Sequence, residues 1–356
     1  MNGSKLGFKP HLLSLPHYPY RKVEAPIKLD QNESAHDLPP QLKERALERL
    51  ATLPWNRYPA LHAEEVREAL AHHTGWTPEG VVVSPGSNLL IQCLAQAATQ
   101  VLDTAPAFPH YAISAKLADT PYRAIPLPEG FRLPLEGLLE AMSGEAGVLF
   151  LPNPHAPTGA LFSQAEVRAL ADRAGETGWL LVIDEAYHQF SGSDSRDLAR
   201  QHPHVALLRT FSKAWGLGGI RAGYLLASPT VANVIQNLLP PFGLPAHTAA
   251  ILLTVLEDPG YIQERVQEVE AERERLYRAL QRHPTWQVYP SHTNFLLVRT
   301  PDAAEAYRAL LERGILVRRQ DHYAGLEGCI RISVGTSAEN DRLLEAVFEV
   351  AGVGHA

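Results

Sequence analysis

The stretch LRTFSKAWGLGGIRAGY, residues 208–224, places a lysine among glycines, hydroxyl groups and an arginine. Apolar residues before it are typical of a buried strand, so Lys213 follows a strand end. Glycines let the backbone approach a flat or anionic ligand. The hydroxyls of Thr210 and Ser212, with the guanidinium of Arg221, suit a phosphate group. A nicotinamide site is excluded, because Arg221 stands where a dinucleotide fingerprint needs its third glycine.

Lys213 also stands out through the way the chain uses cations. Arginine is much more frequent than lysine, and none of the 143 residues after Lys213 is a lysine. A primary amine forms a Schiff base, whereas a guanidinium does not. Lys213 is therefore a candidate for covalent catalysis, although a surface lysine placed by chance explains this fact equally well.

Short apolar runs alternate with helical patterns around this stretch. Such alternation predicts a mostly parallel sheet covered by helices on both faces, with ligands at the carboxyl ends of the strands. The expected strands are 81–84, 148–152, 179–184, 204–210 and 220–228, and the expected helices between them are 87–100 and 163–178.

The C-terminal part has a different pattern, with a long polar helix expected over 260–282. After it come a strand, a helix and a strand, over 293–300, 303–314 and 329–335. The predicted fold class is α/β, with a large mostly parallel, helix-covered domain and a smaller α+β domain. The expected boundaries are an N-terminal arm (1–29), the large domain (30–255) and the small domain (256–356).

Composition restricts the class of protein. The formal net charge is -7, with 20% charged residues and no basic tract, which argues against nucleic acid or an anionic membrane surface as partner. No apolar run has transmembrane length, and the N-terminus lacks a signal-peptide pattern. The two cysteines form no disulfide framework or metal motif, so a soluble cytoplasmic protein without a metal site is expected.

A carboxylate and a phenol follow the strand expected over 179–184. Asp184 ends a very apolar run, and a carboxylate there needs a cationic or hydrogen-bonding partner. Tyr187 lies three residues on and can face the same pocket. Asp184 either caps the strand end or keeps a heterocyclic nitrogen protonated, as carboxylates do for pyridoxal phosphate.

Two further segments add weaker signals. SPGSNLL, residues 84–90, joins a strand to a helix whose free N–H groups suit a phosphate, although Ser87 is equally well an ordinary N-cap. Phe108 can stack on a planar ring or fill the core. Together with Lys213 and Asp184, these segments describe a pyridoxal 5′-phosphate site.

With these features, the chain resembles the fold-type I aminotransferases, and within them it is most similar to the histidinol-phosphate branch. The resemblance covers nearly the full length, and its SKA and DEAY motifs, in this order, are highly specific to the superfamily. The matching segments are KLDQNES (28–34), NRYP (56–59), PTG (157–159), DEAY (184–187), RTFSKAWGLGGIRAGY (209–224), HTNF (292–295), GILVRRQ (314–320) and CIRISVGT (329–336).

The resemblance implies a role for each cofactor-facing residue. Lys213 would join the cofactor through a Schiff base and move a proton between substrate and cofactor. Asp184 would pair with the pyridinium nitrogen, and Tyr187 would hydrogen-bond the phenolic oxygen. The residues implied at the phosphate or against the ring are Ser87, Asn88, Ser212, Arg221 and Phe108.

The resemblance also implies substrate and partner. Arg331 matches the family arginine that holds the acidic group of the substrate, and Arg318 matches a second one, although Arg319 adjoins it and either could be a solvated rim residue. L-histidinol phosphate with 2-oxoglutarate or glutamate would be the substrates, in histidine biosynthesis. Tyr58 of NRYP would reach the neighbouring subunit's cofactor phosphate and so make a homodimer part of the site. Tyr18 or Tyr20 would close over the substrate.

The chain departs from the family pattern at two places. Ala156 precedes Pro-Thr-Gly, where the family has an asparagine that donates a hydrogen bond to the phenolic oxygen, and Asn153 is expected not to reach that point. Asn88 and Leu89 replace an acidic pair. Without the Asn donor, more negative charge stays on the phenolic oxygen, and the linkage to Lys213 should hold its proton to a higher pH. His155 or a water could replace the missing donor.

Other functions fit parts of the same pattern. An aminotransferase for aromatic or other amino acids and a phosphothreonine decarboxylase of the same superfamily both fit the arginines. A regulatory or scaffold protein without turnover is disfavoured, because Lys213 and Asp184 are both present and no DNA-binding segment is evident.

Overall fold

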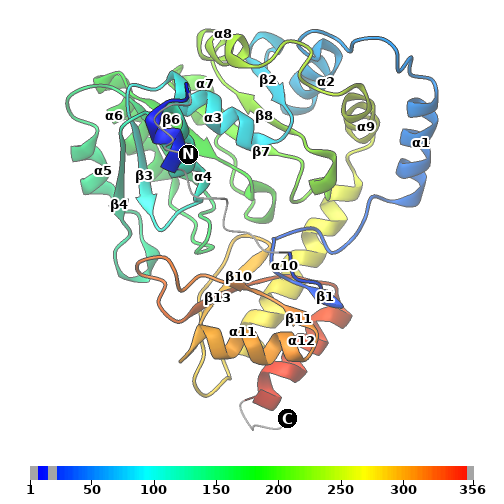
Figure 1. The fold of residues 1–356 in the computed structure, drawn as a ribbon, viewed down its shortest axis with the longest axis vertical. Helices are drawn as coiled ribbons and strands as arrows, with labels where there is room; N and C mark the ends of the chain where they lie inside the picture. Colours follow the sequence, from blue (N-terminus) through cyan, green and yellow to red (C-terminus); the bar gives the residue numbers. More distant parts are fainter. Residues whose placement is uncertain (1–6, 15–21, 351–356) are drawn as a thin grey trace.

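The computed structural model describes residues 7–14 and 22–350 as two units, one above the other, joined by a long helix (Figure 1). The larger unit is built around a seven-stranded sheet of order β2-β8-β7-β6-β5-β3-β4. Its strands are β2 (Val81–Ser84), β3 (Val101–Ala105), β4 (Tyr122–Pro126), β5 (Val148–Pro152), β6 (Leu180–Asp184), β7 (Val205–Thr210) and β8 (Gly223–Leu226).

All neighbouring strands of this sheet run parallel except β8, which is antiparallel to both β2 and β7. The mostly parallel α/β fold expected from the sequence is therefore confirmed. The strand expected over 220–228 is shorter, because Arg221 has a left-handed backbone (φ 57°) and belongs to the turn before β8.

Successive side chains of the buried strands face opposite helical layers, as the pleat of a strand requires. In β6, for example, Leu181 and Ile183 belong to one core and Val182 to the other. The helices packed on the first face are α1 (Pro40–Ala51), α2 (Glu64–Thr74), α5 (Leu135–Ala141), α6 (Gln164–Thr177), α7 (Arg196–Gln201) and α9 (Ala246–Glu257). Those on the second face are α3 (Ser87–Ala97), α4 (His110–Ala118) and α8 (Pro229–Leu238).

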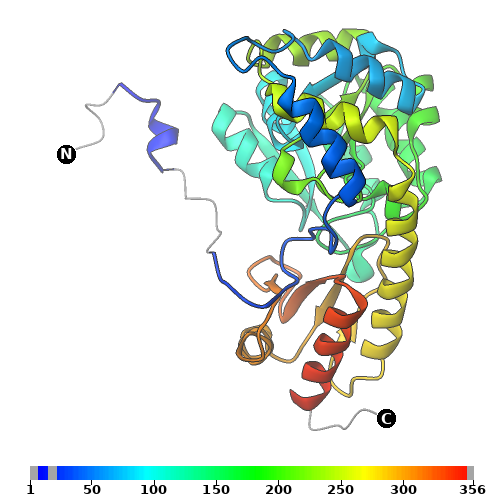
Figure 2. The same ribbon diagram turned by 90° about the vertical axis from the view of Figure 1, so that its right-hand side faces the viewer.

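The smaller unit has its own core around a four-stranded antiparallel sheet, of order β12-β13-β10-β9. Its strands are β9 (Gln287–Val288), β10 (Phe295–Arg299), β12 (Arg318–Arg319) and β13 (Cys329–Ser333), with helices α11 (Ala303–Glu312) and α12 (Ser337–Val350). The joining helix is α10 (Tyr261–Leu280), whose end packs beside α12 (Figure 2).

The chain crosses between the two units near its N-terminus. Strand β1 (Ile27–Lys28) pairs in parallel with β11 (Ile315–Leu316) of the smaller unit, and the following residues run past the junction toward α1 (Figure 1). Tyr18 and Tyr20 lie outside the described residues. The expected domain boundaries at 29/30 and 255/256 stay a prediction.

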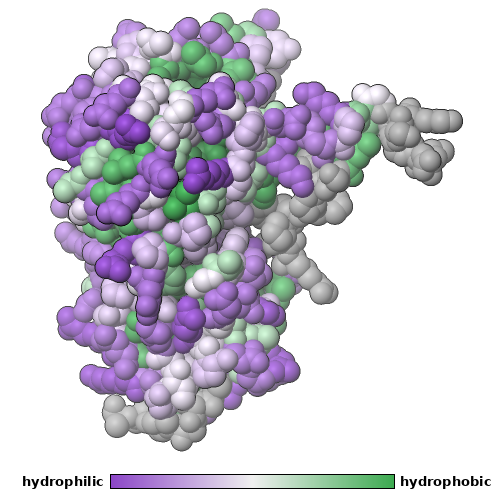
Figure 3. Space-filling model, turned by 90° about the vertical axis from the view of Figure 1, so that its left-hand side faces the viewer, coloured by the Kyte–Doolittle hydropathy of each residue, from purple (hydrophilic) through white to green (hydrophobic). Residues whose placement is uncertain are grey.

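The surface is mostly hydrophilic on the face that Figure 3 presents, with apolar side chains gathered over the larger unit. Among the described residues, no helix combines the length and the apolar character needed to cross a bilayer.

Candidate active site

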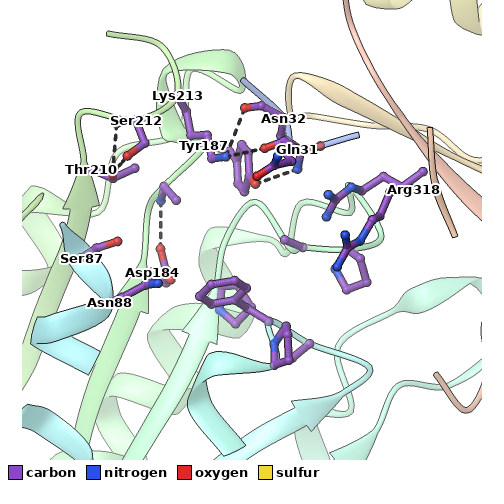
Figure 4. A pocket seen from close by; sticks show the side chains of 18 of the residues that line it. Gln31, Asn32, Ser87, Asn88, Asp184, Tyr187, Thr210, Ser212, Lys213 and Arg318 are labelled. Atoms are coloured by element: carbon purple, nitrogen blue, oxygen red, sulfur yellow. Dashed lines mark hydrogen bonds between the residues drawn. The ribbon is translucent and has the colours of Figure 1, made fainter. Parts of the chain in front are cut away.

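A cavity of about 410 Å³ lies at the carboxyl ends of the parallel strands, where the two units meet. Ten of the eleven site residues expected from the sequence line it. They are Ser87, Asn88, Phe108, Asp184, Tyr187, Ser212, Lys213, Arg221, Arg318 and Arg331. Figure 4 shows Ser87 and Asn88 on one side, Arg318 on the other, and Lys213 with Tyr187 between them.

One side of the cavity is formed by the first turn of α3 and the turn before β8. Gly86 (φ 84°) precedes the helix, and a Cβ built on it would lie 2.5 Å from Nη2 of Arg221. Gly86 is the N-cap of α3, so Ser87 is the first helical residue and not the N-cap. The free N–H groups of this turn, the Ser212 hydroxyl and Arg221 form a concave site for an anion.

Asp184 lies at the end of β6 and is held at both carboxylate oxygens. Tyr111 of α4 donates to Oδ2 at 2.6 Å, and the backbone N–H of Ala186 donates to Oδ1 at 3.0 Å. Burial raises the pKa of Asp184 to about 6, while these two hydrogen bonds act in the opposite direction. Asp184 thus caps the strand end and also faces the cavity.

Lys213 follows β7 and extends into the cavity. Its Nζ donates to the backbone carbonyls of Gln31 (3.0 Å) and Asn32 (3.1 Å). Burial, and then the positive charge of Arg331, lower the pKa of Lys213 to about 7. A large fraction of this amine is therefore neutral near neutral pH, as a nucleophile or base requires.

Tyr187 lies beside Lys213, with the amine 5.8 Å from the centre of its ring. Its hydroxyl oxygen accepts a hydrogen bond from Nδ2 of Asn32 at 2.9 Å. Burial raises the pKa of Tyr187, so the phenol keeps its proton at neutral pH.

The two arginines are neighbours across the small sheet, with Arg318 of β12 paired to Arg331 of β13. Arg331 donates through Nη2 to the Asp30 carbonyl at 2.9 Å and lies over Phe295. Among the described residues, its buried Nε has no hydrogen-bond partner. Arg319 points away, exposed and paired with Asp321. Arg318, and not Arg319, therefore joins Arg331 in the cavity.

The loop over 151–159 places no polar side chain where the missing asparagine was expected. Ala156 packs against Tyr187 and Phe295. Asn153 is bonded to the backbone of Phe162, so it does not reach the site. His155 is fully buried and bonded to Thr104 and Thr158. His155 is therefore not the replacement donor, and the effect of Ala156 on cofactor titration stays a prediction.

Tyr58 is the one expected site residue that does not line the cavity. It is 83% exposed and stacks on Phe242, with the ring centres 5.0 Å apart. Within one subunit, Tyr58 is therefore not part of the site.

Tyr111 and Asn32 were not among the site residues expected from the sequence. Tyr111 stands three residues after Phe108, so a helical turn beginning there could have placed both beside Asp184. Asn32 lies in KLDQNES, and only its long-range contacts with Tyr187 and Ser333 reveal a function. Within 7–14 and 22–350, no group of His, Cys, Asp or Glu is arranged to hold a metal ion.

Comparisons of the sequence and of the structure with known proteins point to aminotransferases. The family model for aminotransferase class I and II matches residues 24–347. A histidinol-phosphate aminotransferase of Deinococcus radiodurans is 48% identical over 96% of each chain, and one of Pyrococcus furiosus is 37% identical over 93% of this chain and 95% of its own. The crystal structure of histidinol-phosphate aminotransferase from Sinorhizobium meliloti in complex with pyridoxal-5′-phosphate superposes with a TM-score of 0.86, at 28% identity and 98% coverage of each chain.

Proposed function

Because the chain belongs to the class I and II aminotransferases, which use pyridoxal 5′-phosphate, we propose that it transfers the amino group of L-histidinol phosphate to 2-oxoglutarate in histidine biosynthesis. The observation that carries this proposal is the pair Arg318 and Arg331, which face the same cavity as Lys213. The names of its full-length relatives support the same substrate.

The cavity fits the phosphate of the cofactor at the first turn of α3. A Cβ on Gly223 would lie 2.3 Å from the backbone nitrogen of Ser87, so the two chain segments approach as closely as glycine allows. The backbone N–H groups of Ser87 and Asn88, the Ser212 hydroxyl and Arg221 would then hold the phosphate.

The cavity also fits the pyridine ring. The ionised carboxylate of Asp184 would bind the protonated nitrogen of the ring. Tyr111 favours this ionised carboxylate, because it donates a hydrogen bond to it. Phe108 would lie against the ring and Tyr187 beside the phenolic oxygen. When bound, the cofactor supplies an electron sink for the bond to the reacting carbon.

Lys213 would join the cofactor and later move the substrate proton. Its amine is held by two backbone carbonyls, and its pKa is lowered to about 7, so both protonation states are accessible near neutral pH, which suits both tasks. Tyr187, which lies beside the amine, belongs to an apolar cluster with Ala156 and Phe295, and this cluster makes one wall of the site poorly hydrated.

Two arginines in one anion site favour a phosphate ester over a lone carboxylate. Arg318 and Arg331 carry like charges side by side, an arrangement that a doubly charged group stabilises. The same pair would accept the distal carboxylate of glutamate in the second half-reaction.

A panel of half-reactions tests the substrate. The purified holoenzyme is mixed separately with histidinol phosphate, glutamate, phenylalanine and phosphothreonine, and loss of the long-wavelength absorbance of the cofactor is followed. We expect fast conversion with histidinol phosphate and glutamate. Conversion by phenylalanine without histidinol phosphate, or release of carbon dioxide from phosphothreonine, would contradict the proposal. A protein that gains no visible absorbance after the cofactor is added would contradict the assignment as a pyridoxal phosphate-dependent enzyme.

We also propose a homodimer in which Tyr58 completes the partner's phosphate site. The support is the exposure of large apolar side chains in the segment 47–61, which contains Tyr58, and of Phe242, on which Tyr58 stacks. They are Leu47 (58% exposed), Trp55 (89%), Leu61 (42%) and Phe242 (40%). Large exposed aromatic side chains are typical of protein–protein interfaces.

Subunit mixing tests the shared site. We expect that Lys213→Ala and Tyr58→Ala proteins, mixed in equal amounts after dissociation, recover about a quarter of the wild-type activity at limiting cofactor, because about half of the dimers are mixed and each has one intact site. Mixing Lys213→Ala with Asp184→Asn is the matched control, since both sites of that hybrid are defective. Activity no higher than the sum of the separate variants would refute the shared site.

A cytoplasmic setting is also proposed. Cys93 and Cys329 are both buried and unpaired, as thiols commonly are in reducing compartments.

A further inference from the structure

Asn32 lies at the junction of the two units and contacts both. It is 1% exposed and has a left-handed backbone with φ 54°. Toward the smaller unit, its N–H donates to Ser333 Oγ (2.8 Å), its Oδ1 accepts from Ser333 Oγ (3.1 Å), and its carbonyl accepts from Asn294 (3.0 Å). Toward the larger unit, it contacts Lys213 and Tyr187.

These contacts determine the orientation of the Asn32 amide. The Ser333 hydroxyl has one proton, which it donates to Oδ1 of Asn32. The Nδ2 group therefore faces Tyr187 and donates to its hydroxyl oxygen at 2.9 Å. Because Tyr187 accepts this bond, its own hydroxyl proton is left for another acceptor.

Among the described residues, the groups around Tyr187 leave only one direction, toward the cavity, in which its hydroxyl proton can find an acceptor. Ala156 and Phe295 pack against the ring, with Phe295 edge-on at 5.4 Å between ring centres. On the remaining side, Tyr187 lines the cavity next to Lys213. Ala156 supplies no competing donor or acceptor.

We propose that Asn32 is a positioning residue that turns the hydroxyl proton of Tyr187 into the cavity, toward the phenolic oxygen of bound pyridoxal phosphate. This inference rests on the cofactor of the family and not on the identity of the amino donor. It assigns the side-chain amide of Asn32 a role that compensates in part for Ala156, because it secures Tyr187 as a donor to that oxygen.

The charged groups around Tyr187 and Lys213 are the same in the wild-type protein and in variants of Asn32. Arg331 and Asp184 act on Tyr187, and the groups that act on Lys213 are Arg331, Glu33, Arg221 and Lys28. None of them is altered by a change at Asn32, and the charge that Asn32→Asp itself adds beside Lys213 is measured separately in the Tyr187→Phe background.

Asn32→Asp tests the proposal, because aspartate has the same shape and tolerates the left-handed backbone. It keeps an acceptor for Ser333 but replaces the Nδ2 donor with a second acceptor. Tyr187 would then donate to Asp at position 32 instead of the cofactor. Without that donor, the phenolic oxygen keeps more negative charge, and the nitrogen contributed by Lys213 holds its proton more tightly.

The readout is the pH midpoint of the colour change of the bound cofactor, measured without substrate. We expect it to rise by about one pH unit or more in Asn32→Asp. Tyr187→Phe should raise it similarly. In the Tyr187→Phe background, Asn32→Asp should add only the rise that comes from its charge, so the shift should be smaller than the one it causes when Tyr187 is present.

Asn32→Gly, which also suits the left-handed backbone, is the uncharged variant. It should raise the midpoint less than Tyr187→Phe does, and should have no effect once Tyr187 is Phe. The proposal is overturned if Asn32→Asp leaves the midpoint unchanged, or if either change at Asn32 shifts it equally with and without Tyr187. A wild-type protein that gains no colour would instead contradict the cofactor assignment.

Discussion

Replacing Lys213 with arginine is expected to lower the rate of amino transfer by about four orders of magnitude. The change keeps a long basic side chain in the cavity but replaces an amine that titrates near neutral pH with a group that stays charged. A guanidinium stays protonated at all accessible pH values and does not form a Schiff base. In the wild-type protein, burial and Arg331 hold the pKa of the amine at about 7, so a proton can be both taken up and released.

Single-turnover measurements with saturating cofactor and amino donor check this expectation. Lys116→Arg is the matched control, because Lys116 lies exposed on α4, away from the cavity, and should leave the rate unchanged. Activity of the Lys213→Arg protein within tenfold of wild type would show that another group carries the proton.

The architecture of the larger unit could be predicted because its buried strands are continuous apolar runs. The two strands that the sequence did not predict lack that signal. β3 contains the buried Asp103, which interrupts the run VLDTA. β4 lies at the sheet edge with largely exposed side chains and shows no apolar alternation. Apolar runs therefore predict buried strands, including β2 at the other edge of the sheet, better than an exposed edge strand or a strand with a buried carboxylate.

The cofactor side of the cavity could be predicted because its residues follow consecutive strands, and the carboxyl ends of parallel strands meet at one edge. Tyr111 and Asn32 could not be predicted in this way. Their hydrogen bonds span 73 and 155 residues of sequence and depend on how α4 and the crossing segment pack. Spacing along the chain places Tyr111 one helical turn after Phe108, but it does not predict the hydrogen bond to Asp184 and carries no information about the contacts of Asn32.

Arg331→Gln is expected to lower kcat/KM by about two to three orders of magnitude for both amino donors. The Nη2 group of Arg331 is anchored on the Asp30 carbonyl, while its buried Nε has no partner among the described residues. A substrate anion would satisfy that donor, and glutamine cannot supply both the charge and the planar fork. Arg319→Gln is the matched control, since Arg319 is adjacent in sequence to Arg318 but exposed and paired with Asp321.

The same substitution should also change how the cofactor-free protein captures pyridoxal phosphate. Arg331 lowers the pKa of Lys213, so its removal should raise that pKa above about 7. Only the neutral amine attacks the aldehyde, and the neutral fraction at a given pH falls as the pKa rises. The rate of colour formation should therefore reach its plateau at a higher pH in Arg331→Gln than in wild type or Arg319→Gln. If the pH profile stays in place while kcat/KM falls, Arg331 acts on the substrate alone and does not set the titration of Lys213.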